Sequence, residues 1–554
     1  MRMPTTLLAL GAGLAAFASS AGAPLLAQAP VALSGEVSSA REGPMEGVVV
    51  SAKKDGSTIT VSVVSDDKGH FSFPATRLTA GHYALAIRAV GYDLDAPADA
   101  VVTAGRDTAV DIKLKPTKNL AGQLTNAEWL LSMPGTEAQK KFLLQCNDCH
   151  TFARIVESTH DAAEFMQVFK RMSGYYPGST PLHPQRLTGN AGRDIGKGPE
   201  AQKMAEWLAS VNLSQQDTWN WPLKTLPRLT GRSTHVIITE YDLPRPTIEP
   251  HDVVLDHEGN VWFSDFGEMV LGEMDPNTGK VTEHPIPVVK PGYSLGTLDL
   301  EIDKDNNPWI GLMYQSAIAK FDRKTGKFQI WSTPKAWDSD AGQLGHLAVE
   351  GTPADDTVWI KNSAGGHIYR LNLATNTFAD IGVPKDPRTG KRIGTYGIFS
   401  DAQNNLYLLD FSAGNIVRID AKTQQPTVYL TPTPDSHPRR GRVDAEGRLW
   451  FAEYFGNAIG MLDPKTGKIE EWQVPTRWSS PYDTVFDRNG DAWTGSMNTD
   501  RVARLDVKTG QYVEYPLPHP TNIRRVFVDD SKDPATLWVG NNHGASIVKV
   551  EPLD

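Results

Sequence analysis

The chain has 554 residues, of which 40% are hydrophobic, and a formal net charge of −10. This length exceeds one ordinary domain and predicts three or four. The acidic balance and the lack of a long basic run argue against a nucleic-acid partner, because phosphate binding needs a basic footprint.

The first 29 residues have the features of a signal peptide. Arg2 gives a short positive start, residues 7–17 are apolar and small, and cleavage motifs follow at 21–23 and 27–29. The apolar run is short for a membrane span and no later segment approaches 18 apolar residues, so we do not expect an integral membrane protein. We therefore expect a secreted, periplasmic protein, with an uncleaved anchor as the alternative.

Residues 31–115 have the pattern of a small antiparallel β-sandwich. Stretches rich in β-branched and aromatic residues alternate with Gly, Asp or Pro, and a tight turn stands at 66–69. The stretches are 48–52, 58–64, 70–73 and 82–90. Their order resembles that of carboxypeptidase regulatory-like domains, whose prealbumin-like fold is related to carbohydrate-binding modules. The resemblance implies a spacer or weak binding module without catalytic residues.

The only two cysteines of the chain lie in the motif Cys146-Asn147-Asp148-Cys149-His150. This pattern is typical of covalent c-type haem attachment, in which both thiols bond the porphyrin and the imidazole binds the iron. A redox dithiol would be expected in a thioredoxin-like βαβ context, and a zinc site would need a fourth ligand at matching spacing. Neither is apparent, so we predict a covalent haem c held by Cys146, Cys149 and His150.

The surrounding residues 117–215 have helical periodicity. Thr136 and Asp161 are placed to cap two helices, and Gly198 precedes a third that begins with proline. Together with the long Gly- and Pro-rich loop at 173–198, this arrangement resembles a compact monohaem cytochrome c. It predicts a small all-α domain.

The sixth ligand of the iron decides its chemistry. Met172 ends a predicted helix just before the long loop and is our first choice, since a Met ligand suits an electron-transfer cytochrome. Met204, Met166, His160 and His183 are alternatives, as is an open iron that binds a small molecule. In many small cytochromes c the methionine stands shortly before the last helix, and that pattern is not matched cleanly here.

Residues 233–554 repeat one pattern seven times. An aromatic residue between apolar neighbours recurs every 43 to 50 residues, which is typical of the blades of a β-propeller. The aromatic positions are Trp262, Trp309, Trp359, Tyr407, Trp450, Trp493 and Trp538. Hairpin turns such as 275–280 and 463–468 mark one corner of most blades. The pattern predicts a seven-bladed propeller.

The last repeat lacks an outer strand, and the missing copy stands at residues 236–244. We predict that this first strand completes the seventh blade, because an unclosed ring would expose strand edges. The expected fold is therefore multidomain and mainly β. Its parts are a signal peptide (1–29), a β-sandwich (31–115), a cytochrome c-like domain (117–215) and a propeller (233–554).

Three segments at the start of the propeller carry a further resemblance. They read TEYDLP at 239–244, EPHDVV at 249–254 and GNVWF at 259–263. With the seven blades, they resemble the virginiamycin B lyase (streptogramin lyase) family, a propeller that opens a cyclic depsipeptide by elimination.

The lyase resemblance implies catalytic residues and, only in that case, a Mg²⁺ ion. The implied residues are His251, Glu249 and Asp265, because elimination needs a base and a cation on the developing negative charge. The family's second Pro-His element is not matched, since residues 522–524 read Asn-Ile-Arg.

A set of six side chains is expected at the mouth of the propeller's central funnel. Five lie five residues before the Asp that follows the first strand of a blade, and His346 is placed similarly. The set is His251, His346, Tyr396, Arg439, Tyr482 and Arg524. It suits an anionic or polyhydroxylated ligand better than it copies the lyase site, although a propeller channel forms whether or not it binds anything.

We therefore expect an exported haem protein in which electron transfer is coupled to ligand or substrate binding on the propeller. A redox partner protein and a small-molecule ligand are the expected partners. The alternatives are a lyase acting on a cyclic depsipeptide or related ligand, and a non-enzymatic carbohydrate- or small-molecule-binding or sensing protein. Whether the chain is an enzyme, either a haem-linked oxidoreductase or a lyase, stays open at this point.

Overall fold

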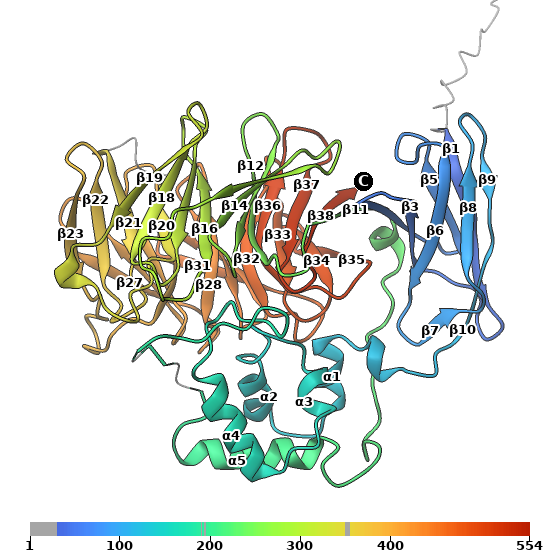
Figure 1. Cartoon of the computed structure of the whole chain (residues 1–554), viewed down its shortest axis with the longest axis horizontal. Coiled ribbons are helices and arrows are strands. Elements are labelled where there is room, and N and C mark those ends of the chain that lie inside the picture. Colours follow the sequence, from blue (N-terminus) through green and yellow to red (C-terminus); the bar gives the residue numbers. More distant parts are fainter. Residues whose placement is uncertain (1–29, 190, 193–194, 350–354) are drawn as a thin grey trace, which may run out of the picture.

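The computed structural model describes residues 30–189, 191–192, 195–349 and 355–554. The predicted signal peptide lies outside the described residues. A β-sandwich, a group of short helices and a propeller follow one another along the chain, and the helices cover one face of the propeller (Figure 1). Within the described ranges, no helix combines the length and apolar character that a membrane span requires.

The sandwich consists of two sheets around an apolar core that includes Leu33, Val37 and Phe73. In the first sheet, β1 pairs with β2, β5, β9 and β10, and β10 pairs with β7. The second sheet has the order β4-β3-β6-β8. The strands are β1 (Val31–Ser39), β2 (Gly43–Pro44), β3 (Val49–Lys54), β4 (Ile59–Val64), β5 (His70–Pro74), β6 (Gly81–Arg88), β7 (Tyr92–Leu94), β8 (Ala98–Val102), β9 (Thr108–Ala109) and β10 (Ile112–Pro116).

The propeller contains six four-stranded antiparallel sheets, each formed by four consecutive strands, and a seventh sheet described below. The strands of the first three sheets are β12 (Pro250–Leu255), β13 (Val261–Asp265), β14 (Val270–Met274), β15 (Val281–Pro285); β16 (Thr297–Ile302), β17 (Pro308–Leu312), β18 (Ala317–Asp322), β19 (Lys327–Ser332); β20 (His346–Ala348), β21 (Thr357–Lys361), β22 (Ile368–Asn372) and β23 (Thr377–Gly382). Those of the next three are β24 (Thr395–Ser400), β25 (Leu406–Asp410), β26 (Asn415–Ile419), β27 (Pro426–Leu430); β28 (Pro438–Val443), β29 (Leu449–Glu453), β30 (Ala458–Asp463), β31 (Lys468–Gln473); β32 (Pro481–Phe486), β33 (Ala492–Ser496), β34 (Arg501–Asp506) and β35 (Gln511–Pro516).

The repeated tryptophans are buried between blades, and four of them make the same type of hydrogen bond, one in each blade. In each of these blades the indole N–H donates to the Asp six residues earlier, at 2.8–2.9 Å. The pairs are Trp262–Asp256, Trp309–Asp303, Trp450–Asp444 and Trp493–Asp487. In these four blades the Asp satisfies the buried indole N–H, so the Asp and the Trp recur together in the sequence.

The seventh sheet joins the two ends of the propeller, as the missing repeat predicted. Strand β11 (Val236–Asp242) pairs with β38 (Ser546–Pro552), beside β37 (Thr536–Asn541) and β36 (Ile523–Asp529). The other edge of β11 pairs with β4 of the sandwich, from Ile237↔Val63 to Tyr241↔Ile59. The blade and half of the sandwich thus form one continuous eight-stranded sheet. The sequence did not predict this second pairing, which covers a strand edge that would otherwise be open.

Three helices of the helical segment begin at an N-cap residue whose side chain accepts a hydrogen bond from a backbone N–H group of the first turn. Thr125, Thr136 and Asp161 all form capping boxes with the residue three positions later. The helices are α1 (Asn126–Ser132), α2 (Glu137–Leu143), α3 (Ala153–Val156), α4 (Ala162–Met172) and α5 (Pro199–Val211), with 3-10 turns η1 (Ala121–Gln123), η2 (Gly231–Thr234) and η3 (Lys335–Trp337).

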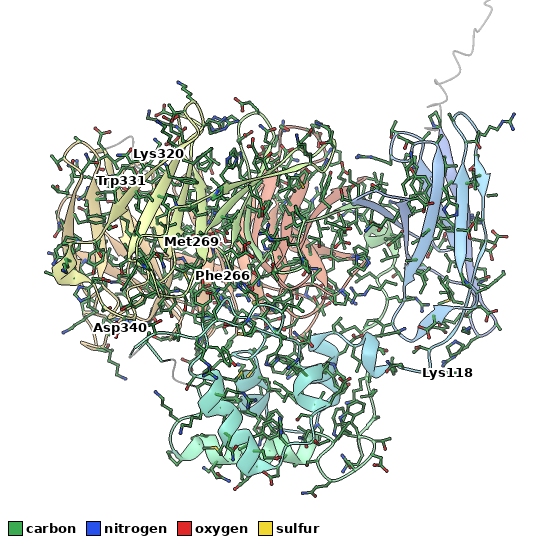
Figure 2. All side chains as sticks on the ribbon, in the orientation of Figure 1. Lys118, Phe266, Met269, Lys320, Trp331 and Asp340 are labelled. Carbon is green, nitrogen blue, oxygen red and sulfur yellow. The ribbon has the colours of Figure 1, made fainter. Side chains whose placement is uncertain are left out.

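The helices share one apolar core with the propeller. Tyr454, Trp478, Tyr482 and Met497 of blades five and six pack in the same cluster as buried residues of the helices, such as Trp129. Lys118 marks the connection that leaves the sandwich, and Phe266 lies on the propeller near the face that the helices cover (Figure 2). The helical segment is therefore docked on the propeller through a continuous core.

We predict that shortening one buried side chain of β11 destabilises both the sandwich and the propeller. Ile238 is fully buried and packs in a cluster with strands of both the sandwich and the propeller. Ile238→Ala should lower the free energy of unfolding by about 2–5 kcal/mol, as a cavity-forming substitution does. Leu430→Ala is the matched control, because Leu430 is 58% exposed on an outer strand. Urea unfolding followed by tryptophan fluorescence tests this, and equal stabilities of the two variants would contradict it.

Candidate functional site

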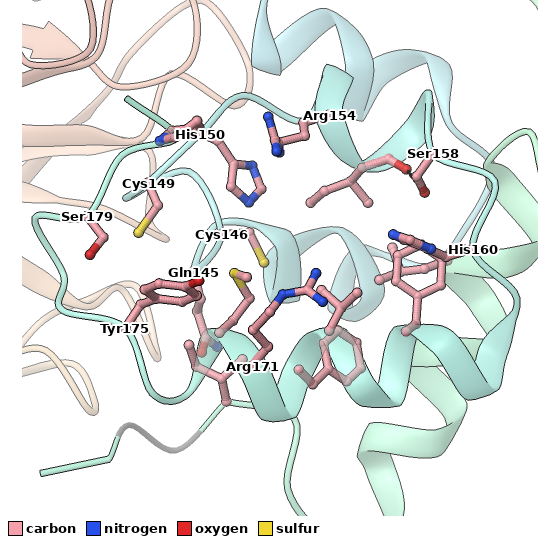
Figure 3. Close-up of a pocket in the computed structure, with 18 of the residues that line it drawn as sticks. Gln145, Cys146, Cys149, His150, Arg154, Ser158, His160, Arg171, Tyr175 and Ser179 are labelled. Atoms are coloured by element: carbon pink, nitrogen blue, oxygen red, sulfur yellow. Dashed lines mark hydrogen bonds between the residues drawn. The ribbon is translucent and has the colours of Figure 1, made fainter. Parts of the chain in front are cut away.

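A cavity of about 400 Å³ lies beside the Cys-Xaa-Xaa-Cys-His motif. The motif forms a turn shortly after α2, and Cys146, Cys149 and His150 all line the cavity. Figure 3 shows the three residues grouped around one space with His160 at its opposite end. Apolar side chains form much of the remaining wall: Ile155, Phe165, Val168, Phe169, Ile195 and Leu208. Both the size and the apolar lining are typical of cofactor sites, which span roughly 300–1,000 Å³.

The imidazole of His150 is oriented by a backbone hydrogen bond. Its Nδ1 lies 3.0 Å from the carbonyl oxygen of Thr151, so Nδ1 carries the proton and Nε2 keeps its lone pair. Burial lowers the pKa of His150, which favours the neutral ring. A metal-binding histidine has this arrangement, with one nitrogen fixed by a carbonyl group and the other available to the metal.

The structure separates the five candidates for a sixth ligand. Met172, at the end of α4, and His160 line the cavity, whereas Met166, Met204 and His183 are not among its lining residues. The ring of His160 packs edge-on against Phe165 at 5.5 Å. Met172 therefore remains a candidate on geometry, with His160 as the alternative.

The residue after the first cysteine reaches the propeller. Asn147 is fully buried, and its side chain donates to Asn498 Oδ1 at 2.8 Å. Tyr454 donates to Asn147 Oδ1 at 3.2 Å, and Asn522 donates to its carbonyl oxygen at 3.1 Å. The turn between the two cysteines is thus held by three residues of the propeller.

The next residue, Asp148, faces two arginines at the predicted mouth. Its carboxylate lies 3.7 Å from Arg439 and 3.6 Å from Arg524. Its carbonyl oxygen accepts hydrogen bonds from Arg524 at 2.8 Å and from His543 at 3.1 Å. The arginines that were expected to hold an anionic ligand instead face a carboxylate of the same chain.

The other predicted mouth residues lie together beneath this contact. Tyr482 donates to Nε2 of His251 at 3.1 Å and is hydrogen-bonded to Tyr396, whose ring lies 4.9 Å from that of His346. Arg439 is stacked over Tyr482 and Tyr396, at 3.9 and 4.7 Å from the ring centroids. The structure thus brings together all six side chains of the set.

His251 is enclosed on every side. It is fully buried, and its Nδ1 lies 2.5 Å from Asp252 Oδ1, so the neutral ring accepts at Nε2. Burial lowers its pKa to about 3 despite that carboxylate. His251 is therefore neutral and only weakly basic, and the Tyr482 hydroxyl occupies its Nε2 in this arrangement.

Glu249 and Asp265, the other two residues that the lyase resemblance implies, are also buried. The backbone N–H of Glu249 donates to Asp265 Oδ1 at 3.3 Å. Burial, and then the charge of Asp265, raise the pKa of Glu249 well above its usual range, and burial raises the pKa of Asp265 to about 7. In the described part of the chain, no group of three or more His, Cys, Asp or Glu is arranged to hold a metal ion.

The sequence interpretation missed the segment that closes the mouth beside Glu249. Residues 174–188 of the long loop lie against blades one and two. Gln185 donates to the carbonyl oxygens of Gly267 and Leu295 at 2.7 and 3.0 Å, and Tyr176 donates to that of Phe266 at 2.8 Å. No local pattern in the sequence marks these contacts.

The sequence interpretation also missed a second ring of charged residues. The sequence does contain a pattern that could have revealed this ring. The residue after a mouth residue is charged in four blades: Asp252, Arg440, Asp483 and Arg525. Arg440 binds both oxygens of Asp252 at 3.1 Å, and Arg525 binds Glu301 at 2.9 Å. All these groups are buried, so paired charges fill the propeller interior behind the mouth.

Comparisons with known proteins identify two parts of the chain. Residues 32–115 match the carboxypeptidase regulatory-like domain, and residues 381–553 match the virginiamycin B lyase family. Neither match covers the helical segment. The N-terminal sandwich is thus similar to carboxypeptidase regulatory-like domains, and the later blades of the propeller are similar to the virginiamycin B lyase family. No curated protein matches the chain.

Solved structures similar to this chain include lyase propellers. A selenomethionine-substituted virginiamycin B lyase from Staphylococcus aureus is 21% identical, with a TM-score of 0.48 over 57% of this chain and 98% of that one. A catalytically inactive variant of that enzyme with quinupristin has the same identity and coverage and a TM-score of 0.49. A streptogramin B lyase structure is 21% identical, with a TM-score of 0.49 over 58% of this chain and 99% of that one.

We predict that Asp265 makes stability depend on pH. Its raised pKa gives a contribution that is fully present below its unfolded value near 4 and is lost as the pH rises through about 7. Asp265→Asn keeps an acceptor for the N–H of Gly267, at 3.0 Å, but cannot ionise. Between pH 4 and 8 the wild-type protein should therefore lose up to roughly 4 kcal/mol relative to this variant.

Urea unfolding at several pH values checks this prediction. The exposed Asp305 gives a control, since Asp305→Asn should leave the profile unchanged. Parallel profiles for the wild type and Asp265→Asn would show that Asp265 does not titrate as described.

Proposed function

We propose that the protein is an exported, periplasmic electron-transfer protein with a haem c covalently attached to its helical segment, docked on a lyase-like propeller. One observation carries this proposal: Cys146, Cys149, His150 and Met172 line a single, largely apolar cavity. Residues of one short motif, in a turn, and a methionine at the end of α4 converge on it, and this set would suit covalent attachment and ligation of the iron.

Six residues that line the cavity have distinct roles in this proposal. Cys146 and Cys149 would hold the haem through thioether bonds, and His150 and Met172 would be the ligands of its iron. Arg154 and Arg171 line the same cavity and are placed to neutralise the acidic groups of the porphyrin. The bound haem supplies a one-electron couple, and the apolar walls exclude water from it. A redox partner protein delivers or removes the electron.

Absorption spectra of the purified full-length protein test the haem. We expect reducible c-type bands that survive acid–acetone extraction, since the attachment is covalent. Cys146→Ala combined with Cys149→Ala should abolish them. Without such bands in the wild-type protein, the proposed function fails.

The axial ligand has its own test. Met172→Ala should remove the charge-transfer band of a thioether ligand and lower the reduction potential, because a Met ligand raises it. Met204→Ala is the matched control, since Met204 lies on α5 and does not line the cavity. A band that persists in Met172→Ala would show that another methionine is the ligand, and a wild-type protein without the band would point to His160 or to an open iron.

A second candidate is a lyase reaction at the propeller. The contact of Asp265 with Glu249, which stands two residues before His251 in the chain, and the family match of residues 381–553 favour it. Neutral His251 would accept the proton, and Glu249 and Asp265 offer the carboxylates that a Mg²⁺ ion uses together with water and substrate. The helical segment would have to leave the mouth to admit a cyclic depsipeptide.

Linearisation of a streptogramin B antibiotic tests this candidate. If the propeller is a lyase, the full-length protein with Mg²⁺ opens the ring, and His251→Ala reduces the rate by about 10²–10⁴-fold, as loss of a general base does. Arg477→Gln, on the exposed rim, is the control. Activity that survives in His251→Ala would remove His251 from the role of base.

A further inference from the structure

The propeller residues around Asp148 form a buried site for the turn between the two cysteines. The side chains of Arg439 and Arg524 are 5% and 2% exposed, and that of Asp148 is 19% exposed. Two cations and one anion thus lie beside the haem-attachment motif in a region with little water. The two arginines and Asp148 together carry one net positive charge.

Four aromatic rings fix the guanidinium group of Arg439. It lies 3.9 to 4.9 Å from the ring centroids of Tyr482, Tyr454, Tyr396 and Phe411. Such stacking holds a guanidinium plane in place. Arg524 is fixed by its hydrogen bond to the carbonyl oxygen of Asp148 and by a 2.6 Å bond to Asn522. Neither cation can move away when the charge of a neighbouring group changes.

We propose that the mouth of the propeller is the second half of the haem site, and that the buried charges of Arg439, Arg524 and Asp148 together set its reduction potential. This inference rests on the proposed function. Reduction adds one electron to the ferric centre and removes one positive charge, so fixed cations nearby favour the ferrous form and raise the potential. The charges are buried, so salt screens their effect less than it would at the surface.

The proposal assigns a sign to each substitution. Asp148→Asn removes an anion and leaves two cations, so the potential should rise. Arg524→Gln removes a cation, so the potential should fall, and Arg439→Gln should act in the same direction. The double variant Asp148→Asn/Arg524→Gln restores one net positive charge, so its potential should return toward the wild-type value.

Potentiometric titration of the haem-loaded full-length protein, with soluble one-electron mediators, measures these shifts. Arg477→Gln is the matched control: Arg477 also bridges the propeller and the helices, through Glu137 at 2.9 Å, but both side chains are largely exposed. Its potential should not change. Arg524→Lys keeps the charge and should stay closer to the wild type than Arg524→Gln.

The outcomes separate this inference from the proposed function. A wild-type protein without c-type bands refutes the haem itself. A haem-loaded protein in which Asp148→Asn does not raise the potential, or in which all variants shift it in one direction, overturns the electrostatic role. Asp148→Asn alone decides the matter if the arginine variants do not accumulate, because it is nearly isosteric.

Discussion

Strand β11 forms hydrogen bonds along both of its edges, and the rest of the architecture depends on this double pairing. One edge closes the propeller through β38, and the other holds the sandwich through β4. The helical segment lies in the chain between the sandwich and β11, so both of its ends leave from elements that this sheet fixes. The double pairing of β11 therefore restricts the position of the helices. Their apolar faces complete a core with blades five and six.

Much of the fold could be predicted from the sequence because its determinants are local or repeated. The blades recur because each needs the same buried aromatic residue, Trp in six blades and Tyr in one, and four blades also repeat the Asp acceptor. The helix starts follow from capping boxes that involve residues three positions apart. The pairing of β11 with β4 could not be predicted, because any strand of suitable length can cover an open edge and the sequence does not specify which one does.

The candidate site was predictable to a similar extent. Counting from the repeated Asp located the mouth residues, since every blade is built alike, and the cavity residues followed from one motif and the end of one helix. The contact between Asp148 and the arginines could not be foreseen, because the partners are 376 residues apart in the case of Arg524. An arginine at a propeller mouth predicts an anion, and the sequence does not reveal that this anion belongs to the same chain.

The burial of Asn147 has a consequence for the order of assembly. Its propeller partners, Tyr454, Asn498 and Asn522, are all synthesised more than 300 residues later. While the chain is growing, the turn between the two cysteines is therefore accessible, and it becomes enclosed only when the last blades form. Any machinery that must grip this turn has a limited period in which to act, and completion of the propeller ends that period.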